Sequence, residues 1–173
     1  LGVDDCRAAE GTVVQAGGRV CYGTFEMGPV GLSAVVEDPG GAVFHLLQPS
    51  DPQAATLPPR PGGWCWAQLM STDRVRDQAF YKALLPWELH DMGPGQAAFV
   101  LEGQPLASVM QLPDPTVPRS HWLHYIAVDD VDATTARALE LGARVLAPVQ
   151  PAGDMGHFSV LQDTAGAAVA LWT

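Results

Sequence analysis

Histidines and cysteines are among the side chains in this 173-residue chain that can bind a metal or act as nucleophiles. His121 and His124 suggest a metal-binding pair, but residues three apart on a strand project from opposite faces of a sheet. The cysteines Cys6, Cys21 and Cys65 are odd in number, show no CxxC spacing, and each lie in an apolar stretch. We therefore expect buried free thiols in a reducing compartment, the cytoplasm, and neither a disulfide nor a zinc site.

His45 lies in an otherwise apolar run, residues 43–47, that is typical of a strand. Two interpretations stay open: a hydrogen-bonded strand histidine, or a metal ligand whose partners lie elsewhere. His90 and His157 are expected at a surface or a cavity rim. No Ser-His-Asp or Cys-His arrangement and no phosphate-binding glycine loop is present in the sequence.

Composition limits the classes of partner. The chain has 9 basic and 19 acidic residues, a net charge of -10, so it lacks the basic stripe that a phosphate backbone requires. No run approaches the roughly 18 consecutive apolar residues of a membrane helix. Hydrophobic residues make up 47% of the chain, which suffices for a packed core. We therefore expect a globular protein that binds neither nucleic acid nor a membrane.

An internal repeat organises the sequence. Residues 3–48 recur without a gap at an offset of 125 as residues 128–173, with 14 identical positions. The matches concentrate at glycines and aspartates, which suit turns and helix starts. The two segments are therefore expected to follow the same backbone path.

The second copy predicts the order strand, helix, strand, strand, strand. Its helix begins after Asp129 or Asp130 and stops at Gly142. The turn that Asp163 opens predicts an antiparallel hairpin. The strands are expected at residues 121–128, 144–146, 158–162 and 167–172, with a proline- and glycine-containing loop after 146.

The first copy has the same helix, after Asp4 or Asp5 and ending at Gly17, but it begins at Leu1 without the opening strand. We therefore expect the chain to be N-terminally truncated. Residues 62–112 predict a third unit of the same order. Its strands are expected at residues 64–70, 87–91, 96–102 and 105–112, with a helix between Asp73 and Pro86.

Proline-rich stretches separate these units. Residues 51–61 and 113–118 are poor material for helices or central strands and are predicted to be linkers. The longer linker is expected to join two domains: residues 1–50, the C-terminal half of a first domain, and residues 62–173, a complete domain of two units.

The paired units, the sequence VDDVDA opening a helix, ELGARV closing it, the DxxG turn and the run from 71 to 88 resemble the vicinal oxygen chelate superfamily. This group contains glyoxalases, bleomycin-resistance proteins and extradiol dioxygenases. The resemblance implies an α+β fold in which paired β-α-β-β-β units form half-open curved mixed sheets around a cavity. The incomplete first unit would find its partner in the missing upstream unit or in a homodimer.

The resemblance also implies where metal ligands would lie, on the first and last strands of each unit. Those positions hold Trp66, Leu123 and Ala170, and in the middle unit Ser108 or Met110 is nearest. Side chains of Trp, Leu and Ala cannot bind a divalent ion. We therefore predict no metal within residues 62–173, while His45, at the position matching Ala170, stays a candidate in the first unit.

An aromatic and largely apolar cavity wall would remain. The expected lining residues share these strands and are Trp64, Trp66, Gln68, Met110, Leu123, Tyr125, Ala170 and Trp172. Alternatively, these side chains fill the space and leave no pocket. The sequence favours a protein that binds a small, apolar or aromatic ligand without a metal, as in the bleomycin-binding branch. The alternative is a metal-dependent lyase, isomerase or dioxygenase whose active site lies in the truncated first domain.

Overall fold

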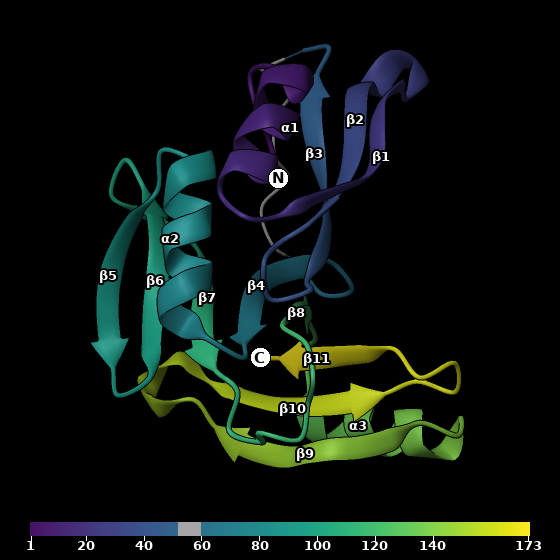
Figure 1. The fold of residues 1–173 in the computed structure, drawn as a ribbon. Coiled ribbons are helices and arrows are strands. Elements are labelled where there is room, and N and C mark those ends of the chain that lie inside the picture. The colour runs from purple at the N-terminus through teal and green to yellow at the C-terminus, as the bar shows by residue number, and fades with distance from the viewer. Residues whose placement is uncertain (52–59) are drawn as a thin grey trace. The chain divides into compact units, whose positions relative to one another are not determined.

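The computed structural model describes residues 1–51 and 60–173 and has a mixed α+β fold (Figure 1). The predicted linker 51–61 falls largely outside the described residues. The first repeat copy contains α1 (Cys6–Gln15), β1 (Arg19–Glu26), the short η1 (Gly28–Val30), β2 (Gly31–Glu37) and β3 (Val43–Pro49). The middle unit contains β4 (Trp64–Ser71), α2 (Arg74–Leu84), β5 (Glu88–Gly93), β6 (Gln96–Leu101) and β7 (Gln104–Gln111). The last copy contains β8 (His121–Ala127), α3 (Val131–Glu140), β9 (Arg144–Pro151), η2 (Gly153–Met155), β10 (His157–Gln162) and β11 (Ala168–Trp172).

Aspartate caps start all three α-helices of the described residues, as predicted. The Asp5 side chain accepts from the backbone N–H groups of Arg7 and Ala8 at 2.8 and 3.0 Å. Asp73 and Asp130 cap α2 and α3 in the same way. Each cap satisfies a donor that the first turn leaves without a helical partner, which stabilises the helix by about 1 kcal/mol.

The two repeat copies have the same glycine after the helix and the same parallel pairing before it. Gly17 and Gly142 follow α1 and α3 with φ of 89° and 94°, a conformation that favours glycine after a helix. Strand β8 pairs in parallel with β11, placing Ala127 beside Trp172. At the equivalent place Gly2 pairs in parallel with Leu47. The end of the opening strand is thus present in the first copy.

Two expectations from the sequence are wrong. Strand β9 continues from Arg144 to Pro151, where a loop was expected after 146; it lies at the edge of its sheet, where a proline interrupts no central ladder. Cys6 is buried and Cys65 half-buried, but Cys21 is exposed. The apolar residues around Cys21 do not bury it, because β1 is an edge strand whose pairing with β2 shifts register between Val20 and Tyr22. All three thiols are free.

The chain divides into two compact units. Among the described residues, unit 1 comprises 1–51 and 68–122, and unit 2 comprises 60–67 and 123–173. The predicted domains 1–50 and 62–173 stay a prediction. No helix among the described residues has both the length and the apolar character needed to cross a bilayer.

In unit 1, α1 lies against the β1-β2-β3 sheet, and α2 lies against strands ordered β5-β6-β7-β4 (Figure 1). Tyr81 of α2 is fully buried at the centre of an aromatic core. Its ring centroid lies 5.0 Å from that of Phe80, 5.5 Å from Phe44 and 5.6 Å from Phe99. Because Phe44 belongs to β3, this core joins the first repeat copy to the middle unit.

In unit 2, α3 covers one face of strands ordered β8-β11-β10-β9. Val131 of α3 packs with Leu161 of β10 and Leu171 of β11. Side chains alternate along each strand, so the neighbours of Leu161 and Leu171 lie on the opposite face. That face is where ligand-lining residues were predicted.

Candidate functional site

The face of unit 2 opposite α3 carries an aromatic cluster. Strand pairing places Tyr125 beside Ala170 and Phe158 opposite Trp172. The rings of Phe158 and Trp172 are stacked, with centroids 6.3 Å apart and planes at 19°. The Tyr125 ring meets Trp172 edge-on at 5.9 Å. We call the residues Leu123, Tyr125, Phe158, Ala170 and Trp172 the aromatic face.

The residues of the aromatic face differ in solvent exposure: three are buried and two are partly exposed. Ala170 is fully buried, and Leu123 and Tyr125 are 5% and 6% exposed. Phe158 and Trp172 are half-buried. A ligand would therefore meet the two stacked rings first, with Tyr125 beneath them.

Burial, and to a smaller degree the Cys65 thiol, raises the pKa of Tyr125 to about 12. The phenol therefore keeps its proton at neutral pH and can donate a hydrogen bond. Tyr125 cannot act as a general base, because a general base must be deprotonated near the working pH.

The structure brings Leu123, Tyr125, Ala170 and Trp172 together, but it places Trp64 differently. Trp64 is 65% exposed, and its ring meets that of His124 edge-on at 5.6 Å. Along β8, His124 alternates with Tyr125, so Trp64 contacts a residue of the other face.

The remaining predicted lining residues lie elsewhere on β4 and β7. Trp66 is half-buried in unit 2, whereas Gln68 and Met110 belong to unit 1. Parallel pairing of β4 with β7 sets Gln68 beside Ser108 and Met70 beside Met110. Met110 Sδ accepts from Gln96 Nε2 at 3.3 Å.

Phe158 is the member of the aromatic face that sequence reasoning missed. The repeat gave no signal, because the matching residue in the first copy is Ser33. Only its pairing opposite Trp172 reveals its place.

The first copy carries polar side chains at the same two positions. Ser33 and His45 match Phe158 and Ala170. The Ser33 hydroxyl donates to Leu46 O at 2.8 Å, and His45 Nδ1 lies 3.0 Å from Ser33 Oγ. Since the hydroxyl proton goes to Leu46, Nδ1 is assigned as the donor, which leaves the lone pair on Nε2 of this exposed histidine.

The superfamily resemblance implies metal ligands at three positions within residues 62–173. Trp66, Leu123 and Ala170 supply no ligand atom. Among residues 1–51 and 60–173, no group of three or more His, Cys, Asp or Glu side chains is arranged to hold a metal ion. The side chains at these three positions therefore do not fit a metal ion.

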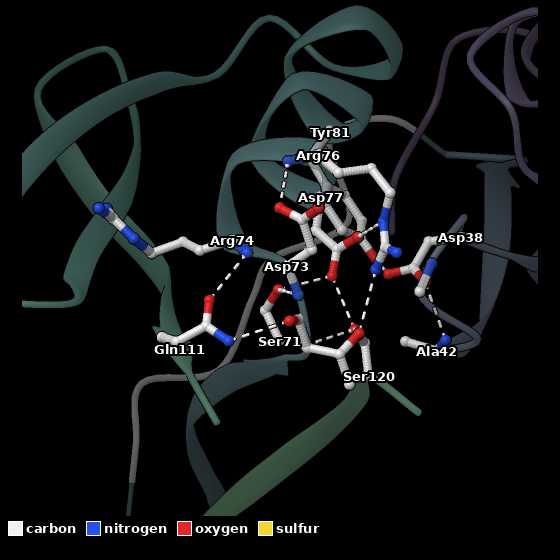
Figure 2. Close-up of polar contacts among 12 residues, drawn as sticks. Asp38, Ala42, Ser71, Asp73, Arg74, Arg76, Asp77, Tyr81, Gln111 and Ser120 are labelled. Atoms are coloured by element: carbon white, nitrogen blue, oxygen red, sulfur yellow. Dashed lines mark hydrogen bonds and ion pairs between the residues drawn. The ribbon is translucent and has the colours of Figure 1, made fainter. Parts of the chain in front are cut away.

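A buried polar network in unit 1 was also missed (Figure 2). Asp77 is fully buried and accepts from Ser71 and Ser120, each at 2.7 Å, and from Arg76 Nε at 2.8 Å. These bonds join the N-terminal part of α2 to the end of β4 and to Ser120, the residue before β8. The network satisfies a buried carboxylate and has a structural role.

Asp38 belongs to the same region. Its Oδ1 accepts from the N–H groups of Gly40 and Ala42, and its Oδ2 accepts from the Tyr81 hydroxyl at 2.9 Å. Burial raises the pKa of the Asp38 carboxyl, and these hydrogen bonds oppose that rise. Burial also raises the pKa of Tyr81 well above its ordinary value, so the phenol stays a donor to Asp38.

A shallow groove of about 460 Å³ lies between α1 and β1 in unit 1. Its lining residues are Arg7, Glu10, Tyr22, Gly23, Thr24 and Phe25. Glu10 Oε1 already accepts from Thr24 Oγ1 at 2.6 Å. None of the predicted site residues lines this groove.

Comparison with known proteins gives the family. The model of the glyoxalase-like domain matches residues 66–172. The candidate glyoxylase CFP32 of Mycobacterium tuberculosis is 35% identical over 171 residues, covering 96% of this chain and 65% of that protein. The anthracycline biosynthesis protein DauV of Streptomyces sp. (strain C5) is 30% identical over 145 residues, covering 82% of this chain and 53% of that protein.

The solved structures show the same fold. The Mn(II)-bound glyoxalase from Novosphingobium aromaticivorans superimposes with a TM-score of 0.65 at 16% identity, covering 99% of this chain and 60% of that one. The chain thus spans 65% or less of the length of these relatives. With its mixed sheets and capped helices, the chain belongs to the glyoxalase-like domain family of the vicinal oxygen chelate superfamily.

Proposed function

We propose that this glyoxalase-like protein binds a flat, largely apolar or aromatic organic molecule on the aromatic face of unit 2, without a metal. This proposal rests on the stacked rings of Phe158 and Trp172, which contact the buried Tyr125. Partly exposed rings offer a flat ligand both stacking and apolar burial. The Tyr125 hydroxyl is the polar group that could orient such a ligand.

One relative, DauV, supports this ligand class. DauV is named for anthracycline biosynthesis, and anthracyclines contain a flat fused-ring system. We therefore choose doxorubicin, an anthracycline with its own fluorescence, as the probe.

Trp172→Ala is expected to weaken doxorubicin binding about 10-fold, corresponding to about 1.4 kcal/mol, because one aromatic stacking partner is lost. Fluorescence titration of the 173-residue chain measures the dissociation constant. Trp64→Ala is the matched control: Trp64 is more exposed and packs on His124, so its removal should leave the constant unchanged. Absence of saturable binding, or equal losses in the two variants, would contradict the proposal.

A second candidate function rests on His45. Its ring is exposed, and Nδ1 is hydrogen-bonded to the Ser33 hydroxyl. Nε2 is therefore the ring atom that could bind a metal. A metal-dependent lyase, isomerase or dioxygenase would then use this face of the first copy, with further ligands from outside the described residues.

For that candidate, Mn²⁺ titration by calorimetry of the complete natural polypeptide is expected to show one site that His45→Ala abolishes. The control is His157→Ala, which removes another exposed histidine. Equal Mn²⁺ binding by wild type and His45→Ala would reject the role of His45, whatever the result for doxorubicin.

A further inference from the structure

The groove between α1 and β1 combines charged groups with aromatic rings, and no residue of the two proposed sites lines it. Arg7 and Glu10 lie on α1, and β1 contributes Tyr22, Thr24 and Phe25. Residues i and i+3 of a helix are neighbours on its surface, so a guanidinium and a carboxylate border the same groove. Its volume of about 460 Å³ is sufficient for a small organic molecule.

An irregularity in β1 brings the two aromatic rings of the groove together. Tyr22 and Phe25 are three residues apart, and in a regular strand they would face opposite sides. The pairing of β1 with β2 shifts register between them, and their rings meet edge-on with centroids 5.3 Å apart. Tyr22 is 63% exposed, so this aromatic pair is open to solvent. The face of an aromatic ring attracts a cation.

Both charged groups of the groove are available to a ligand. Glu10 Oε1 accepts from Thr24 Oγ1 at 2.6 Å, which orients the carboxylate and leaves Oε2 facing no donor among the described residues. The Arg7 side chain is exposed and takes part in none of the ion pairs found within residues 1–51 and 60–173. The groove therefore presents one cationic and one anionic group beside an open aromatic pair.

The last repeat copy shows that the fold does not require these side chains. Strands β9 and β10 pair with the same register shift as β1 and β2. Thr135, which matches Glu10, is buried and bonds instead with Ser159 at 2.8 Å. The residues that match Arg7, Tyr22, Thr24 and Phe25 at an offset of 125 are Asp132, Ala147, Val149 and Gln150. The same backbone thus forms without the charged and aromatic groups of the first copy.

We propose that this groove binds a small zwitterion of the betaine class, in which a quaternary ammonium and a carboxylate lie close together. The ammonium contacts the rings of Tyr22 and Phe25 and the Glu10 carboxylate, because aromatic faces and negative charge recognise quaternary ammonium groups. A primary ammonium has three donors, more than one carboxylate oxygen can satisfy, which favours the quaternary group. The ligand carboxylate accepts from the Arg7 guanidinium, whose planar fork matches a carboxylate.

Electrostatic complementarity requires both charges on the ligand. A ligand with only a cation is repelled by Arg7, and one with only an anion is repelled by Glu10. The site lies in unit 1, so it is separate from the aromatic face of unit 2. Its occupation does not depend on doxorubicin binding or on a metal at His45.

NMR titration of the 173-residue chain with glycine betaine tests the proposal. The amide signals of residues 7–10 and 22–25 are expected to shift and to saturate. Choline keeps the cation without the carboxylate, and acetate keeps only the carboxylate. Each should bind at least about 10-fold more weakly, because a charge-assisted interaction is lost. Equal binding of the three compounds, or no saturable shift at these residues, overturns the proposal.

The last copy supplies substitutions that the same backbone already accommodates. Tyr22→Ala and Thr24→Val introduce the residue types of Ala147 and Val149. Tyr22→Ala should raise the dissociation constant of glycine betaine at least about 3-fold, because one ring of the aromatic pair is lost. Thr24→Val should raise it as well, because Glu10 loses the hydrogen bond that orients it. Unchanged binding by both variants would show that the ligand lies elsewhere.

Arg7→Asp separates the two charges of the ligand. It introduces the residue type of Asp132 and replaces the guanidinium by a second carboxylate. Binding of glycine betaine should weaken at least about 10-fold, whereas binding of choline should strengthen, because the repulsion of its cation is removed. Arg144→Ala, which removes an exposed arginine of β9, is the control and should change neither constant. A change of the same sign for the two ligands in Arg7→Asp would refute the assignment of Arg7 to the carboxylate and with it the zwitterion.

Discussion

Replacing Asp77 by Ala is expected to lower the free energy of unfolding by about 3–5 kcal/mol. Asp77 is fully buried and accepts from Ser71, Ser120 and Arg76. Its removal leaves two serine hydroxyls without their acceptor and the Arg76 guanidinium without its carboxylate. Urea unfolding followed by circular dichroism measures the change.

The matched control is Asp132→Ala. Asp132 lies in the first turn of α3, as Asp77 lies in that of α2, but it is exposed. Its loss removes only a favourable charge near a helix N-terminus, about 0.3–1 kcal/mol. Similar losses for the two variants would show that the Asp77 network does not stabilise unit 1.

Gly31→Ala should lower the free energy of unfolding by about 3 kcal/mol or more. Gly31 has φ of 133°, and a Cβ there would overlap Gln48 O and lie 2.8 Å from Ser50 N. The change would force β2 away from the end of β3. Urea unfolding measures this loss as well.

Two further glycines separate the causes of that loss. Gly28 has φ of 58° with nothing near its Cβ position, so Gly28→Ala reports conformational strain alone, about 1 kcal/mol. Gly11 lies within α1 with open space around it, so Gly11→Ala should stabilise by about 0.5–1 kcal/mol. If Gly31→Ala costs no more than Gly28→Ala, the steric explanation is wrong.

The helices and strands could be predicted from the sequence because the repeat places Asp and Gly, which favour particular backbone positions, at their ends. Asp5 and Asp130 start helices, and Gly17 and Gly142 follow their ends. Such positions depend on local backbone geometry, which neighbouring residues determine. The extension of β9 to Pro151 was missed because an edge strand tolerates proline.

The candidate site was less predictable because it depends on pairing between distant strands. Alternation along single strands put Tyr125 and Trp172 in one predicted group, and their rings are in contact. It could not add Phe158, which needs the β10–β11 register, or predict the contact of Trp64 with His124. The bonds of Asp38 and Asp77 join residues up to 43 positions apart, and no local pattern encodes such contacts.

The matching positions Ser33/Phe158 and His45/Ala170 show how duplication separates chemistry from architecture. Each copy retains the same capped helix and hairpin turn, while the sheet of one copy holds an imidazole and a hydroxyl where that of the other holds a methyl group and a phenyl ring. Mutations on one face need not disturb its duplicate. Exchanging these two residue pairs between the copies would therefore move the polar side chains from one copy to the other while the local backbone stays the same.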